Sequence, residues 1–156
     1  MFLEHLPALL PLVPLTVALA IPLVAAARRE VVYPLAVAAA GATAVLSVLT
    51  LTRVVGGGPI RYHVGGWPPP WGIELVVDHL SAFTAAAVSG MVALALVYAR
   101  PRTGGSEASF FGLALLFLAS LMGMVVTGDL FNLFVFLEVA SISSYALVAS
   151  GGGRAL

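Results

Sequence analysis

The chain has 156 residues, of which 61% are hydrophobic and 9% charged, and its formal net charge is zero. About a quarter of the residues of a soluble globular domain are charged, so this composition excludes an ordinary soluble protein. All seven basic residues are arginines at the ends of apolar runs or in loops, with no basic patch that would indicate a nucleic-acid partner. The lack of cysteine excludes disulfides, thiolate metal sites and catalytic thiols.

Five apolar segments predict an all-α integral membrane protein, with one membrane domain over residues 1–156. The first segment contains several prolines, which a membrane bundle tolerates because neighbouring groups can satisfy the freed carbonyls. The second is rich in alanine and includes Gly41, Thr43 and Ser47, small residues that permit close contact between helices. The predicted helices span, in chain order, residues of about 6–27, 31–52, 80–99, 109–126 and 130–149.

The segment between the second and third helices, residues 53–79, is the one substantial stretch predicted to lie outside the membrane. Two strand-like stretches, 60–64 and 73–77, flank a turn region rich in glycine, proline and tryptophan. This pattern predicts a short β-hairpin on the membrane surface. Trp67 and Trp71 are expected at the lipid interface, where amphipathic aromatic rings are favoured.

The distribution of arginines predicts the orientation in the membrane. With five crossings, the first and third connections and the carboxyl-terminal segment share one face, which carries Arg28, Arg29, Arg100, Arg102 and Arg154. The opposite face carries only Arg53 and Arg61. Positively charged loops favour the cytoplasm, so we expect a multi-pass protein of the cell inner (plasma) membrane. The amino terminus and the hairpin are then outside, and the carboxyl terminus is cytoplasmic.

Glu138 is the lone carboxylate in the fifth apolar run. It lies nine residues after Asp129, or roughly 13 Å along a helix, close to the middle of a hydrocarbon layer about 30 Å thick. An acidic residue at that depth costs roughly 2.5–3.5 kcal/mol and is usually functional. Ser141 and Tyr145 follow on nearly the same helix face. We interpret Glu138 as a proton-pathway residue supported by Ser141 and Tyr145; the alternative is a structural carboxylate at a helix contact.

The other polar residues near helix ends have local explanations. Asp129 follows Gly128 and precedes an apolar helix, so we interpret it as an N-cap, with a pathway entrance as the alternative. Asp78 and His79 open the third helix, where capping and interface solvation explain them. The three histidines lack metal-ligand spacing, so no metal site is predicted. No phosphate-binding, dinucleotide or nucleophile motif is present, and we expect no catalytic residue or cofactor in this chain itself.

Two segments resemble a known family. Residues 128–139, Gly-Asp-Leu-Phe-Asn-Leu-Phe-Val-Phe-Leu-Glu-Val, with Ser-Ser-Tyr-Ala-Leu at 143–147, closely resemble the fifth transmembrane helix of the antiporter-like subunits. These subunits occur in Mrp-type Na⁺/H⁺ antiporters, respiratory complex I and membrane-bound hydrogenases. Residues 65–81 resemble the hairpin and the start of the third helix of the same proteins, most of all the Mrp D subunit and its complex I relative. The resemblance places Glu138 at the family's proton-pathway glutamate, which pairs with a lysine on the seventh helix.

The resemblance implies a proton-translocating subunit of a multisubunit cation/proton antiporter. Its partners would be the lipid bilayer, other subunits and protons, with Na⁺ a second candidate ion. One alternative is a membrane-arm subunit of a redox-driven complex, of the NADH:quinone oxidoreductase or hydrogenase type, in which other subunits transfer the electrons. Another is a structural or non-functional membrane fragment. Family members are longer and contain two inverted repeats, so we expect the amino-terminal part of such a subunit, either truncated or completed by a second polypeptide.

Overall fold

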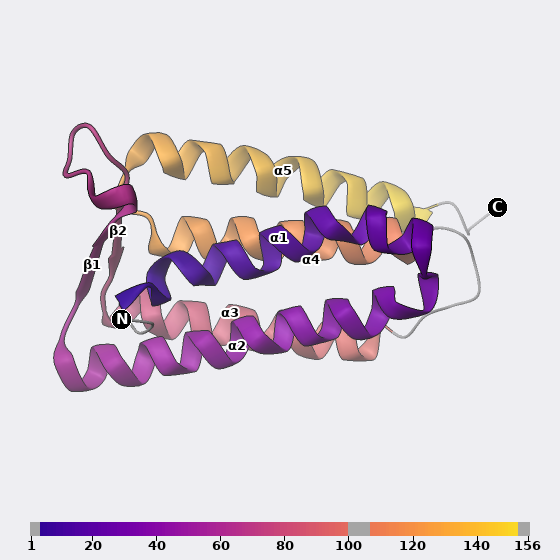
Figure 1. The fold of residues 1–156 in the computed structure, drawn as a ribbon, viewed down its shortest axis with the longest axis horizontal. Coiled ribbons are helices and arrows are strands. Elements are labelled where there is room, and N and C mark those ends of the chain that lie inside the picture. The colour runs from indigo at the N-terminus through magenta and orange to yellow at the C-terminus, as the bar shows by residue number, and fades with distance from the viewer. Residues whose placement is uncertain (1–3, 100–106, 153–156) are drawn as a thin grey trace.

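The computed structural model describes residues 4–99 and 107–152. Five long helices lie side by side, and a two-stranded hairpin crosses one end of the bundle (Figure 1). Within the described residues, all five helices are long and apolar enough to cross a membrane. This confirms the predicted all-α membrane fold with a hairpin between the second and third helices. The helices are α1 (Leu6–Ala27), α2 (Val32–Gly57), α3 (His79–Tyr98), α4 (Glu107–Val126) and α5 (Leu130–Gly152).

The second helix is longer than the sequence predicted. It continues five residues beyond the expected end at residue 52, through Arg53 to Gly57, so the part of the chain outside the helices is shorter than 53–79. The helix ends at Gly58, whose φ of 84° is left-handed and whose N–H donates to Val54 O at 2.8 Å. Glycine adopts this conformation without the steric cost that other residues incur, so Gly58 can serve as the C-cap of the helix.

The hairpin consists of β1 (Ile60–His63) and β2 (Glu74–Val77), which are antiparallel, with Tyr62 opposite Leu75 and His63 opposite Glu74. Its strands lie within the two predicted strand-like stretches. It crosses the bundle from the end of α2 towards the start of α5 and then returns to α3 (Figure 1).

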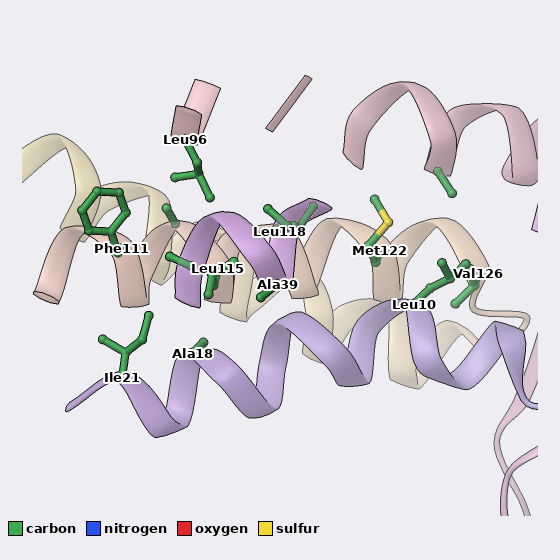
Figure 2. Close-up of a cluster of buried hydrophobic side chains, with 14 of the residues drawn as sticks. Leu10, Ala18, Ile21, Ala39, Leu96, Phe111, Leu115, Leu118, Met122 and Val126 are labelled. Atoms are coloured by element: carbon green, nitrogen blue, oxygen red, sulfur yellow. The ribbon is translucent and has the colours of Figure 1, made fainter. Parts of the chain in front are cut away.

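A buried hydrophobic cluster has members from α1, α2, α3, α4 and β2. Figure 2 shows the part of it where α1 packs against α4. Leu10 and Val126 lie near the hairpin end, and Ile21 and Phe111 near the other end, and all four side chains are buried. Helix α1 is continuous across Pro11, Pro14 and Pro22, as expected for a membrane bundle. Lipid tails are as apolar as these side chains, so this contact is stabilised by close packing more than by removal from water.

Small side chains occupy the buried faces of α2 and α3. Thr43 and Ser47 on α2 are buried, and each hydroxyl donates to the backbone carbonyl four residues earlier, both at 2.9 Å. Ser89 on α3 does the same towards Ala85 O at 2.6 Å. Because these hydroxyls are satisfied within their own helices, the two helices can approach without unpaired polar atoms. Gly41 is not at the closest contact, since a Cβ added there meets nothing within 4 Å.

Candidate functional site

The helix that carries Glu138 starts at a short polar connection after α4. Asp129 precedes α5, and its Oδ1 accepts a hydrogen bond from Phe131 N–H at 2.8 Å, the arrangement of a helix N-cap. Thr127 Oγ1 accepts a bond from Asn132 Nδ2 at 3.0 Å and one from Asp129 N–H at 3.3 Å. The Asn132 side chain therefore bonds back to the connection that precedes its own helix. These bonds define where α5 begins.

Glu138 lies on the exposed face of α5. In the described part of the chain, no hydrogen bond or ion pair engages its carboxylate. The face towards α4 is the opposite one, with Ala140 and Ser143 buried. Of the apolar stretch of α5, 11% is buried, against 56% for α4, so α5 is an outer helix with one face free. In a bilayer that free face would meet either lipid or further protein. A carboxylate there must face further protein or a water-filled space, because lipid does not solvate its charge.

Glu138, Ser141 and Tyr145 are not joined by hydrogen bonds among the described residues. Ser141 Oγ donates to Leu137 O, one turn earlier in its own helix, at 2.9 Å. Tyr145 is 74% exposed. The three residues share the outer side of α5 but do not form a hydrogen-bonded chain there.

The hairpin contacts the connection between α4 and α5, which sequence reasoning did not anticipate. Gly128 N–H donates to Glu74 O at 2.9 Å, and Thr127 forms an antiparallel bridge with Leu75. The far edge of β2 is thereby paired with residues just before α5. Gly128, a residue without a side chain just before a helix, was a sequence signal for the close approach of another segment. The sequence does not identify that segment as β2.

Asp78 caps α3 through a reciprocal arrangement. Its Oδ1 accepts a bond from Ser81 N–H at 2.8 Å, while Ser81 Oγ accepts one from Asp78 N–H at 2.8 Å. This capping box confirms the interpretation of Asp78 as a helix cap. The backbone and hydroxyl of Ser81 lower the pKa of the Asp78 carboxyl, because both donate to its ionised form.

A shallow cavity of about 370 Å³ lies between β2, the start of α3 and the end of α4. It includes Asp78 and Thr127 but not Glu138. The described residues contain no group of three or more acidic or histidine side chains that could hold a metal ion. The geometry around Glu138 is therefore that of a single carboxylate on an unpartnered helix face.

No family model matches the chain. The N subunit of NADH-quinone oxidoreductase from Desulforudis audaxviator is 46% identical over 159 residues, covering 97% of this chain and 31% of that protein. The D subunit of a probable K⁺/H⁺ antiporter from Rhizobium meliloti is 44% identical over 92 residues, covering 59% of this chain and 17% of that protein. The chain is a homologue of the antiporter-like membrane subunits.

Solved structures of membrane complexes contain chains that share this fold. The membrane-bound sulfane sulfur reductase, an archaeal respiratory membrane complex, matches with a TM-score of 0.87 and 31% identity over 96% of this chain and 31% of the matched chain. The Mrp complex from a Dietzia species matches with a TM-score of 0.79 and 28% identity over 94% of this chain and 27% of the matched chain. The chain thus spans about a third or less of the length of these relatives.

Proposed function

We propose that this chain is part of a proton-translocating subunit of a multisubunit cation/proton antiporter, and that Glu138 is the carboxylate that carries the proton. The observation that supports this most directly is a lone carboxylate on the free face of α5, about 13 Å along the helix from its cap at Asp129. Homology to the D subunit of an antiporter adds support from sequence.

The mechanism requires only that a positive charge approach and leave this carboxylate. A cation within about 4–6 Å favours the ionised form and releases the proton, and its departure favours the protonated form. The resemblance to the family assigns that charge to a lysine on a later helix. The free face of α5 leaves the Glu138 side chain accessible to such a group.

A second candidate is a proton-pumping subunit in the membrane arm of a redox-driven complex. The match that favours it is the N subunit of NADH-quinone oxidoreductase, because it covers nearly the whole chain. In that setting this chain would still move protons through Glu138, while other subunits transferred electrons. Turnover that requires Na⁺ or K⁺ would favour the antiporter, and turnover that requires quinone reduction would favour the redox complex.

We propose the orientation that the arginines indicate. Arg28 and Arg29 lie at the end of the bundle opposite the hairpin, and Arg61 lies on the hairpin. The hairpin end would face outward and the α1–α2 connection the cytoplasm. Other subunits of a membrane complex and the bilayer would surround the bundle, with protons and Na⁺ as the candidate ions.

The test is ion-coupled transport by membrane vesicles that contain the full-length subunit in its complex. Glu138→Gln should abolish transport, because it removes the proton site at almost unchanged size, and Glu138→Asp should keep partial activity. Glu107→Gln is the matched control, since Glu107 lies in the first turn of α4, away from the proposed pathway. Unchanged turnover in Glu138→Gln would reject the proposal, whichever complex contains the chain.

A further inference from the structure

Helix α5 is anchored by few elements. It packs mainly on α4, and only residues 127–129 connect the two helices. Most of its large apolar side chains are exposed, among them Phe131, Phe134 and Ile142. The rotation and depth of α5 therefore depend on a small number of contacts.

The first contact is a notch on α4. Gly123 is buried, and the Phe136 ring lies so close to it that a Cβ atom at this position would overlap the ring. Phe136 precedes Glu138 by two residues, which at 3.6 residues per turn puts the two side chains roughly 200° apart around α5. With Phe136 seated against α4, Glu138 points away from α4.

The second contact holds the start of α5. A Cβ atom at Gly128 would lie 2.8 Å from Val76 Cγ2 and 3.2 Å from Glu74 O, so glycine is needed here for close approach to β2. This approach allows Gly128 N–H to donate to Glu74 O and Thr127 to pair with Leu75.

Strand β2 is itself held from its other side. The Glu74 carboxylate accepts a bond from Arg61 Nη1 at 3.2 Å, and His63 Nε2 lies 3.4 Å from the same oxygen. One residue along β1 from Arg61, Tyr62 Oη lies 2.9 Å from His5 Nδ1, just before α1. The hairpin thus connects the start of α1 to the start of α5.

We propose that Gly123 and Gly128 are positioning residues for Glu138. Gly123 sets the rotation of α5 through Phe136, and Gly128 sets its depth by joining its start to β2. Together they hold the carboxylate at one height on the outer face of the bundle, where a cation can reach it. The part of this inference that concerns proton transfer rests on the proposed function of Glu138; the part that concerns helix position does not.

The experiment measures position and transport separately in the full-length subunit within its complex. Nitroxide labels on Ala27→Cys and Ser150→Cys report the distance between α1 and α5, and both native residues are exposed in the described chain. The 156 residues contain no cysteine, so the two labels are unique within them. The variants are Gly123→Ala and Gly128→Ala. Gly112→Ala is the matched control on α4, because its Cβ would lie at an ordinary 3.5 Å from Ile21 Cγ2.

We expect both test variants to shift or broaden the distance distribution and to lower turnover severalfold at unchanged KM for the cation, while Gly112→Ala changes neither. Wild-type distances in both variants would overturn the inference. A shifted distance with wild-type turnover would also overturn it, since α5 would then be movable without consequence for the proton. Full turnover in Glu138→Gln would instead reject the proposed function and leave the distance result standing.

Phe136→Leu covers the case in which an alanine variant does not accumulate in the membrane. It removes the ring without adding a clash, so α5 should become less ordered, and an unchanged distance distribution would refute the role of the notch. The double variant Gly123→Ala with Phe136→Leu should recover turnover relative to Gly123→Ala alone, because the overlapping ring is gone. An absence of recovery would assign the defect to something other than this contact.

Discussion

The depth of Glu138 can be tested by the free energy of membrane insertion. Helix α5 has 23 residues from Leu130, so its midpoint is Ser141. Glu138 lies three residues before that point, or about 4.5 Å along the axis. A charged acidic residue near the centre costs about 2.5–3.5 kcal/mol and leucine contributes about −0.3 to −0.6, using the translocon value for aspartate. Glu138→Leu should therefore favour insertion by about 3–4 kcal/mol, or roughly 100- to 1,000-fold.

The assay is translocon-mediated insertion of residues 130–152 in a host protein with glycosylation sites on both sides. The control moves the same chemistry to the helix end: Leu130→Glu puts a carboxylate beside the cap at Asp129, where the interface and the helix dipole favour it. We expect Leu130→Glu to change insertion much less than Glu138→Leu. Equal effects at the two positions would show that Glu138 is not deep in the hydrocarbon layer, and the reasoning from its cost would be wrong.

Three further predictions concern the bundle and the hairpin. Leu10→Ala should destabilise the protein by about 2 kcal/mol in detergent unfolding, the lower end of the usual cost because lipid also solvates leucine. Leu19→Ala, at a 66% exposed position of the same helix, should cost almost nothing. Similar losses of unfolding free energy in the two variants would contradict the packing of α1. The pKa of Asp78 is lowered in the folded chain, so its capping contribution is present above the ordinary Asp pKa and lost as pH falls through the lowered value. Asp78→Asn should remove this acid dependence of the melting temperature. The same melting temperature against pH in variant and wild type would contradict the prediction. Trp67 and Trp71 are the two tryptophans of the sequence and are 65% and 85% exposed. Lipids brominated near the headgroup should quench their fluorescence more than lipids brominated deep in the acyl chains. The reverse order would contradict the position of the loop at the lipid interface.

Several features of this protein could be predicted from sequence because their causes are local. The number and order of the helices follow from five apolar runs, since a chain in lipid must satisfy its backbone hydrogen bonds within each segment. Asp78 could be assigned to a helix start because a cap acts on the first turn of its own helix, although its partner Ser81 was identified only in the structure. The end of α2 was missed for a local reason as well: the apolar run stops before Arg53, whereas the helix continues to Gly57 and is capped by Gly58.

The position of Glu138 on the bundle was decided by tertiary structure. The sequence showed that Glu138 lies in the middle of an apolar run, but not that its side chain is exposed on the outer face of α5. Membrane helices are apolar on all sides and lack the polar face that marks the outside of a soluble helix. The sequence also did not identify the partners of Gly123 and Gly128, which are Phe136 and Glu74. Each contact joins residues from different elements, and only the packing of those elements brings them together.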